Sequence, residues 1–201
     1  EAIDPVRFIG NHSSGKMGFA LAKTAADLGA QVYLISGPSH QKIKHSSVHR
    51  VDVKSADEMY VEAHKYFKDV DIAILSAAVA DYKPSSISDQ KIKKKETLLT
   101  LELTKTKDIL ASLGKIKKHQ FLVGFALETN NEIANAKGKL QRKNLDAIVL
   151  NSLQDKGAGF ATDTNKITII DTNLNEIAFE LKTKVAVAKD IMNEIIKQID
   201  A

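Results

Sequence analysis

Short apolar segments alternate with amphipathic helical segments along the chain, and this alternation limits the possible folds more than any other feature. Residues 31–36, 48–53 and 71–77 are apolar runs of strand length. One helical pattern precedes the first run, and another separates the second run from the third. Such an order is typical of a mainly parallel sheet with helices on both faces. We therefore predict an α/β, Rossmann-like fold in which residues 71–77 form a buried strand.

The second half of the chain continues this pattern and then changes it. Residues 121–127 and 146–151 are predicted strands, with a helix near residues 131–144 between them. The segment 166–181 predicts a two-stranded hairpin as a C-terminal extension. No repeat or linker divides the sequence, so we expect a single domain over residues 1–201. A last helix is predicted by apolar residues at helical spacing: Val185, Ala188, Met192, Ile195 and Ile199.

Local signals indicate where two helices begin and end. Ser13 or Ser14 is predicted to cap the first helix, and Gly29 is predicted to stop it. Ser55 and Glu58 have the spacing of a capping box at the start of the second helix.

The composition excludes several classes of protein. The chain has no cysteine, which removes disulfides, thiolate metal sites and a cysteine nucleophile. No apolar run approaches the ~20 residues of a membrane span, and no signal-peptide pattern opens the sequence. The net charge of +4 is mild, and surface lysines alone could produce it. We expect a soluble, cytoplasmic protein with no membrane partner.

The stretch "GNHSSGKM" over residues 10–17 nearly matches a phosphate-binding P-loop. Only its last position departs, because Met17 has no hydroxyl to ligate Mg²⁺. The glycines would let the backbone approach a ligand, next to a helix N-terminus that favours anions, or they simply form a turn. Asn11 is harder to explain as a turn residue, since its amide can both donate and accept hydrogen bonds. Lys16 is interpreted as a solvated helix residue. His12 could be a base or a surface residue, and the surface is favoured.

Ligands of a parallel sheet bind beyond the carboxyl ends of its strands. Four segments should therefore converge there: residues 10–18, 76–84, 105–109 and 124–131. In the second of them, Asp81 supplies a carboxylate for hydroxyl groups or a divalent cation. The neighbouring alanines leave room for a ligand against the backbone, or serve close packing of sheet on helix.

Lysines form two further groups. A hydrophilic segment carries Lys91, Lys93, Lys94 and Lys95, which is either a solvated face or a mobile loop that brings one lysine onto a triphosphate. Lys139 and Lys143 are four residues apart and would share one helix face. At the carboxyl ends of the strands they would form an anion clamp.

Several of these segments together resemble a known family. They read "IDPVRFIGNHSSGKMG", "SAAVADYKP" followed by "KIKK", "GFALETNN" and "KLQRKNLDAIVLN", in the family's order. The sequence is similar to the synthetase domain of bacterial coenzyme A biosynthesis proteins, which are phosphopantothenate–cysteine ligases. The resemblance implies condensation of 4′-phosphopantothenate with cysteine through an acyl-cytidylate, using CTP and Mg²⁺ and releasing CMP and pyrophosphate. It also implies a homodimer.

Residue by residue, the resemblance implies catalytic roles for Asn11, Arg7, Ala78 and Lys91. Arg7 would lie beside Asn11, Ala78 would present its backbone to the reacting groups, and Lys91 would also bind CTP. The implied nucleotide contacts are Asp81, Lys91, Thr106, Lys107, Asp108, Ile109, Phe125, Lys139 and Lys143. Thr106 and Lys107 replace the usual Asn-Pro, so only backbone contacts are expected of them, and Gly10 replaces a usual serine. The resemblance assigns no residue as a metal ligand.

The family commonly has more chain ahead of this domain. The resemblance implies an additional strand with a Gly-Thr turn before Glu1, and often a fused flavin-dependent decarboxylase domain; neither is in this sequence. We therefore expect no FMN site within residues 1–201.

Two rival functions make different demands on the sequence. An NAD(P)-binding Rossmann-type reductase, or a plain dinucleotide-binding module, should carry an acidic residue at the end of the second strand. The segment "QVYLISGPS" has none there. A nucleic-acid binder should interleave aromatic residues with its lysines, and "KIKKK" contains none.

Overall fold

The computed structural model describes residues 1–93, 97–152 and 162–200, and its centre is a five-stranded sheet with the order β3-β6-β7-β8-β9. The first three strands are parallel, and β8 and β9 add to them as an antiparallel hairpin, as predicted. These strands comprise β3 (Ile72–Leu75), β6 (Phe121–Glu128), β7 (Ala147–Ser152), β8 (Thr164–Asp171) and β9 (Glu176–Thr183).

Two more strands form a separate sheet. β1 (Val32–Ser36) pairs in parallel with β2 (Val48–Asp52), and neither pairs with β3 among the described residues. The prediction that residues 71–77 form a buried strand is wrong in part, because all four residues of β3 are partly exposed. The physical reason is that β3 lies at the edge of its sheet, with β6 as its only partner in the described chain.

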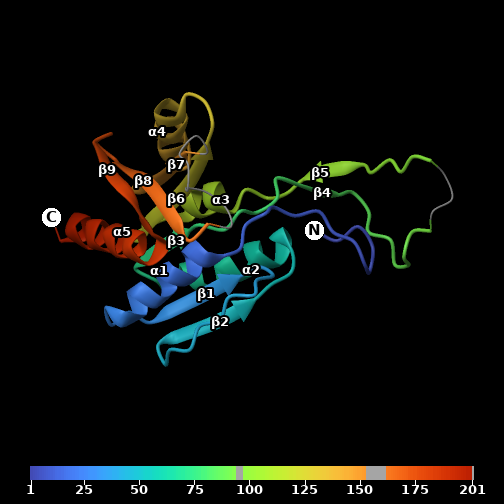
Figure 1. Ribbon diagram of the computed structural model, residues 1–201, viewed down its shortest axis with the longest axis horizontal. Helices are drawn as coiled ribbons and strands as arrows, with labels where there is room; N and C mark the ends of the chain where they lie inside the picture. The colour runs from blue at the N-terminus through green and yellow to red at the C-terminus, as the bar shows by residue number, and fades with distance from the viewer. Residues whose placement is uncertain (94–96, 153–161, 201) are drawn as a thin grey trace.

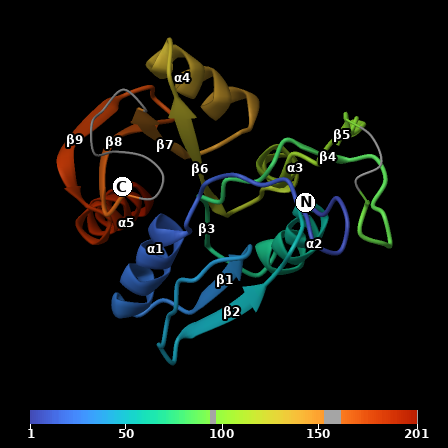
Figure 2. The same cartoon turned by 45° about the vertical axis from the view of Figure 1, so that its right-hand side comes forward.

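Helices cover both faces of the five-stranded sheet, as Figures 1 and 2 show. α1 (Lys16–Asp27) and α5 (Lys184–Ile199) pack together on one face. α3 (Ile109–Ile116) and α4 (Glu132–Arg142) cover the other. α2 (Ala56–Phe67) lies against α3 and the β1–β2 pair. The fold is thus the layered α/β arrangement that the alternating pattern predicts.

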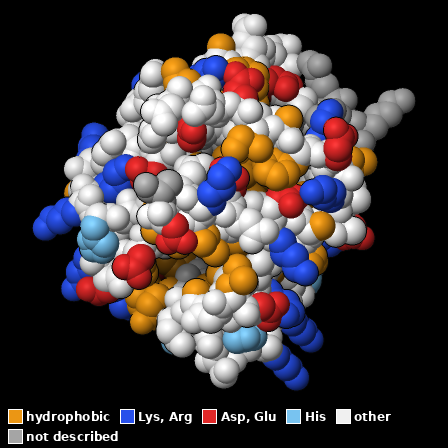
Figure 3. Space-filling model, turned by 90° about the vertical axis from the view of Figure 1, so that its left-hand side faces the viewer, with side chains coloured by type: hydrophobic (Ala, Val, Ile, Leu, Met, Phe, Trp, Pro, Cys, Tyr) orange, Lys and Arg blue, Asp and Glu red, His pale blue; other side chains and the backbone are white. Residues whose placement is uncertain are grey.

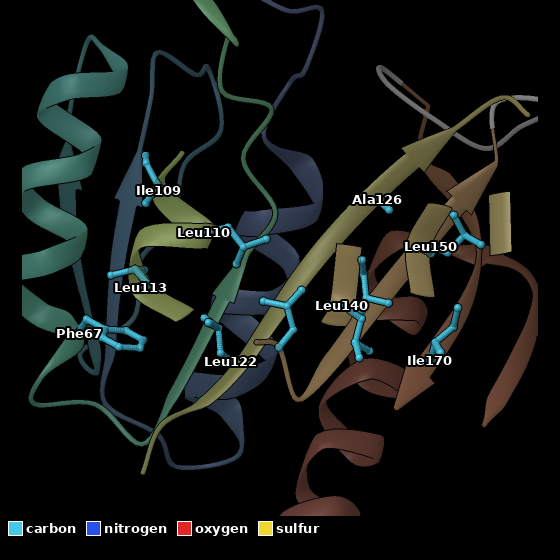
Figure 4. Close-up of a cluster of buried hydrophobic side chains, with 12 residues drawn as sticks. Phe67, Ile109, Leu110, Leu113, Leu122, Ala126, Leu140, Leu150 and Ile170 are labelled. Atoms are coloured by element: carbon cyan, nitrogen blue, oxygen red, sulfur yellow. The ribbon is translucent and has the colours of Figure 1, made fainter. Parts of the chain in front are cut away.

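Each face of the sheet has its own core, because successive residues of a strand point to opposite sides. In β7, Ile148 and Leu150 join the core under α3 and α4, whereas Val149 joins the core under α1 and α5. Figure 4 shows the first core, where Leu113, Leu122 and Ile170 meet side chains of three helices. Burial of each such side chain stabilises the fold by roughly 1.5–3 kcal/mol.

The helix signals were only partly correct. Ser55 caps α2 by accepting a hydrogen bond from the Glu58 amide at 3.2 Å, and Gly29 ends α1 with a left-handed φ of 97°. Neither Ser13 nor Ser14 caps α1. Gly15 takes the N-cap position with a φ of 81° and offers no side chain to the helix, so the first turn of α1 lacks a side-chain acceptor for its N–H groups.

An extended arm, described over residues 82–93 and 97–105, projects from the body (Figure 1), and the sequence patterns did not indicate its strands. β4 (Tyr82–Pro84) and β5 (Leu103–Lys105) pair antiparallel at its base. These strands are only three residues long and largely exposed, so they carry no apolar alternation. α3 was missed as well, because its eight residues are too few to show a clear helical period.

The end of the molecule opposite the arm has a mixed surface. In Figure 3, lysine and arginine side chains lie among acidic ones and small hydrophobic patches, with no continuous basic area. In the described ranges, no helix is long and apolar enough to cross a membrane.

Candidate active site

The four predicted segments are linked by hydrogen bonds and, through the end of α4, by an ion pair. We call these segments, residues 10–18, 76–84, 105–109 and 124–131, the loop cluster. Its first link is Asn11, whose side-chain amide donates to the Ala78 carbonyl at 2.8 Å. A Cβ on Gly18 would lie 3.1 Å from the Ser76 hydroxyl, so the first turn of α1 sits directly beside the end of β3. An amide and free helix N–H groups therefore meet at the carboxyl edge of the sheet.

The second link fixes the segment that carries Asp81. Thr106 donates its hydroxyl to the Ala80 carbonyl at 2.7 Å and its amide to the Asp81 carbonyl at 2.9 Å. The Thr106 side chain is thus part of the framework. The Asp81 side chain remains exposed.

The third link is an ion pair between Lys143 and Asp108, with 2.8 Å between Nζ and Oδ2. Asp108 is also the N-cap of α3, accepting from the Ala111 amide at 2.9 Å. Gly114 lets α3 approach the C-terminal end of α4 closely, because a Cβ at position 114 would lie 1.9 Å from the Lys143 carbonyl. Burial works to raise the pKa of Asp108, but the hydrogen bonds from Lys143 and Ala111 outweigh it and lower that pKa.

Burial affects the charge of Lys139, the first of the two clamp lysines. Its ammonium donates to the Phe125 carbonyl at 2.7 Å. Burial lowers the pKa of Lys139, and the charge of Lys143 lowers it further, against the carboxylates of Glu128, Asp108 and Asp81. A further anion in the loop cluster would favour the charged form of this lysine.

Two predicted nucleotide contacts, Lys107 and Ile109, have side chains directed away from the loop cluster or buried in the core. The Lys107 ammonium is 3.6 Å from the Asp57 carboxylate and lies over the Tyr60 ring, so it faces α2. Ile109 is buried in the core at 6% exposure. In this conformation neither side chain is directed at the loop cluster, in agreement with the departure of Lys107 from the family pattern.

Asn151, at the carboxyl end of β7, is a polar residue that sequence reasoning did not select. Its Oδ1 is buried and has no hydrogen-bond partner in the described structure. By the alternation along β7 it shares the sheet face of Val149 and α1. An unpaired buried acceptor is energetically costly.

The exposed carboxylate of Asp81 is a donor that a magnesium ion carried by a nucleotide could use. Among the described residues no cluster of three or more His, Cys, Asp or Glu side chains could hold a metal. Mg²⁺ commonly binds one or two carboxylates together with substrate phosphates and water. The exposed carboxylate of Asp81 fits that partial role.

Arg7 and Lys91 lie outside the loop cluster. The Arg7 guanidinium donates to the Asp4 carboxylate and to the Ile92 carbonyl, the latter at 2.8 Å, so its described hydrogen bonds are with the N-terminal segment and the arm rather than with Asn11. Lys91 is exposed on the same arm, and Lys94 and Lys95 fall outside the described residues. In this chain alone, the structure brings together Asn11, Ala78, Asp81 and the clamp lysines, but not Lys91.

A family model and several curated proteins match nearly the whole chain. The family model of the DNA/pantothenate metabolism flavoprotein C-terminal domain matches residues 1–199. The chain is 45% identical over 195 residues to the coenzyme A biosynthesis bifunctional protein CoaBC of Bacillus subtilis, covering 97% of this chain and 48% of that protein. It is 55% identical over 197 residues to a cysteine/cysteine sulfinic acid decarboxylase from an unknown prokaryotic organism, covering 98% of this chain and 55% of that protein. The chain thus spans about half the length of these curated relatives.

Solved structures agree with the sequence matches. The crystal structure of the C-terminal domain of CoaBC has a TM-score of 0.84 and 38% identity, covering 100% of this chain and 90% of that one. A complex of the Cab2 protein with phosphopantothenate-cysteine shares the fold, with a TM-score of 0.74 and 17% identity over 99% of this chain and 82% of that one. The family resemblance drawn from the sequence is confirmed. The chain belongs to the DNA/pantothenate metabolism flavoprotein C-terminal domain family and is homologous to the phosphopantothenoylcysteine synthetase domain of CoaBC.

Proposed function

We propose that this chain is a phosphopantothenate–cysteine ligase of coenzyme A biosynthesis that uses CTP. The observation that carries the proposal is the loop cluster, where Asn11, the start of α1, Asp81 and two lysines meet at the carboxyl edge of the sheet. Family membership supports the same reaction. The NAD(P)-reductase alternative is not favoured by these relatives, and β1 ends at Ser36 without an acidic residue.

In the first half-reaction, the carboxylate of 4′-phosphopantothenate attacks the α-phosphorus of CTP, and pyrophosphate leaves. Lys139 and Lys143 share one helix face and would neutralise the anionic nucleotide, in part by exchanging their present partners for phosphate. The uncapped first turn of α1 offers N–H groups to a second phosphate. Mg²⁺ held by the phosphates and Asp81 would stabilise charge on the reacting phosphoryl group.

In the second half-reaction, the cysteine amine attacks the acyl carbon of the acyl-cytidylate and CMP leaves. The step needs the acyl carbonyl to be oriented and its developing negative charge to be stabilised. Asn11 carries a neutral amide at this point, fixed by its bond to the Ala78 carbonyl. Its position suits it to hold the mixed anhydride without repelling it.

The homodimer and the cytoplasmic location are part of the proposal. The arm exposes a run of large apolar side chains, which a second copy of the chain would cover: Tyr82, Ile87, Leu98, Leu99, Leu101 and Leu103. Leu98 is 83% exposed, which is unusual for a leucine that stays in water. Light scattering should give twice the chain mass, whereas a monomer would contradict this part. A cytoplasmic enzyme would find CTP and cysteine in its own compartment.

Thermal shift with three nucleotides separates the candidate functions. The proposal predicts a higher melting temperature with CTP and Mg²⁺, a smaller change with ATP, and none with NADH. Lys143→Gln should weaken the CTP shift, whereas Lys137→Gln, on the same helix but paired with Glu176, should not. Stabilisation by NADH instead of CTP would overturn the proposal in favour of a reductase.

A further inference from the structure

A buried carboxylate, Asp4, joins the N-terminal segment to the arm. The Asp4 side chain has 0% exposure, although it is charged and lies on a short surface segment. Its Oδ1 accepts from the amides of Val6 and Arg7, at 2.9 and 2.8 Å. Its Oδ2 accepts from the Arg7 guanidinium and from the Ile92 amide, the latter at 3.1 Å. Buried charge of this kind is stable only when every lone pair is used, as it is here.

These contacts hold the arm on both sides of Lys91. On one side, the Ser88 amide donates to the Ile3 carbonyl at 3.0 Å. On the other side, Ile92 is held at both its amide, by Asp4, and its carbonyl, by Arg7 at 2.8 Å. The two anchors enclose Lys91 in a segment of five residues, 88–92. In Figure 2 the N-terminal segment runs toward the arm, in agreement with these bonds.

We propose that Asp4 is a positioning residue that sets the backbone of the Lys91 segment and so aims Lys91 at the nucleotide. The inference rests on the proposed function, because it takes Lys91 to act in ligation. Arg7 belongs to the same anchor, because its guanidinium donates both to the Asp4 carboxylate and to the Ile92 carbonyl. Lys91 itself forms no ion pair with the described residues, so the anchored backbone is what limits where its side chain can reach.

The chemistry of the anchor requires a carboxylate at position 4. An asparagine could keep one oxygen for the Val6 and Arg7 amides. Its NH₂ group would then face the Arg7 guanidinium and the Ile92 N–H, where only an acceptor fits. Asp4→Asn therefore removes the link to Ile92 with almost no change in size.

Hydrogen exchange tests the anchor without reference to any activity. Asp4→Asn should speed exchange of the Ile92 amide about tenfold, which corresponds to the loss of one charge-assisted hydrogen bond. Asp52→Asn is the matched control, since Asp52 pairs with Arg50 at 2.7 Å on β2, away from the arm. Should Asp4→Asn fail to fold, Arg7→Lys keeps the charge but loses the donor to the Ile92 carbonyl, so it should speed exchange of the Ile92 amide in the same direction and by less than tenfold.

A double-mutant cycle tests the link to Lys91. Asp4→Asn should lower kcat about tenfold in the wild-type background and have little further effect when combined with Lys91→Gln. The KM for cysteine should stay unchanged. Unchanged exchange at Ile92, or losses in kcat that add across the two sites, would overturn the proposal. If the wild-type chain forms no ligation product, the proposed function fails, and the exchange result still decides whether Asp4 holds the segment.

Discussion

The loop cluster and the arm carry residues of the same proposed reaction, but they hold them in different ways. At the loop cluster, three of these side chains are bonded to a neighbouring segment: Asn11 to Ala78, Lys139 to Phe125 and Lys143 to Asp108. On the arm, Lys91 has no such partner among the described residues, and only the backbone around it is fixed.

This difference separates two ways of preparing a charged group for a ligand. Paired lysines lose little entropy on binding, but they must exchange an existing partner for a phosphate. An unpaired lysine gains its whole interaction when the ligand arrives, so its contribution depends on how well its backbone is aimed. Removing Lys91 should therefore affect the reaction rate most, and removing a clamp lysine should affect nucleotide binding most.

The largest expected effect is that of Lys91→Gln. We predict a fall in kcat by a factor of about 10² to 10³, because a fixed positive charge opposite the triphosphate is lost. Lys93→Gln should change kcat little and lower only its sensitivity to salt. Steady-state kinetics at two ionic strengths measure both. Equal damage from the two variants would show that the lysine run acts only as general positive charge.

Asn11→Asp should slow the second half-reaction much more than the first. A carboxylate at this position cannot donate to the Ala78 carbonyl and would repel the phosphate of the mixed anhydride. We predict that acyl-cytidylate accumulates while the second step slows roughly 100-fold. Quenched reactions with labelled CTP measure the intermediate. Wild-type rates of product formation would remove Asn11 from the mechanism.

Clamp variants should affect binding more than rate. Lys143→Gln or Lys139→Gln is predicted to raise the KM for CTP about tenfold, equivalent to one charge-assisted contact, with a smaller effect on the KM for cysteine. Lys137→Gln serves as the control on the same helix. Unchanged CTP kinetics in both clamp variants would leave the two lysines as structural charges.

The smallest effect concerns acid stability. The Arg7 hydrogen bond, with those of Val6, Ile92 and the Arg7 amide, holds the pKa of Asp4 well below its ordinary value. The charged carboxylate therefore stabilises the fold above the ordinary pKa of an aspartate, and its contribution is lost as pH falls toward the lower pKa of the folded state. The difference in unfolding free energy between wild type and Asp4→Asn should shrink from pH ~7 to pH ~3. Urea unfolding measures it, and a constant difference would contradict it.

The sequence predicted the features that repeat along the chain. α5 and the β8–β9 hairpin followed from periodic apolar residues, and the convergence of the four segments followed from the rule for parallel sheets. The N-cap of α1 was assigned wrongly because two serines precede Gly15, and a left-handed glycine gives no side-chain signal. Residue propensities could not decide whether a serine or Gly15 takes the N-cap position.

Contacts between distant residues were beyond sequence reasoning. The bond from the Ile92 amide to Asp4 spans 88 positions and joins two irregular segments without a shared period. The one available signal was the Asp4 side chain accepting from Val6 and Arg7, a local turn that "DPVR" is well suited to form. That turn predicts a capped bend but not its partner on the arm. The partial exposure of β3 could not be predicted from the sequence either, because it depends on which strands pair.

Pyrophosphate release in the absence of cysteine tests the central claim most directly. The chain would be mixed with CTP, Mg²⁺ and 4′-phosphopantothenate, and pyrophosphate and CMP would be followed separately. We predict a burst of pyrophosphate of about one per active site without CMP, followed by CMP and 4′-phosphopantothenoylcysteine in equal amounts once cysteine is added. The absence of a burst together with the absence of product after cysteine addition would contradict the account.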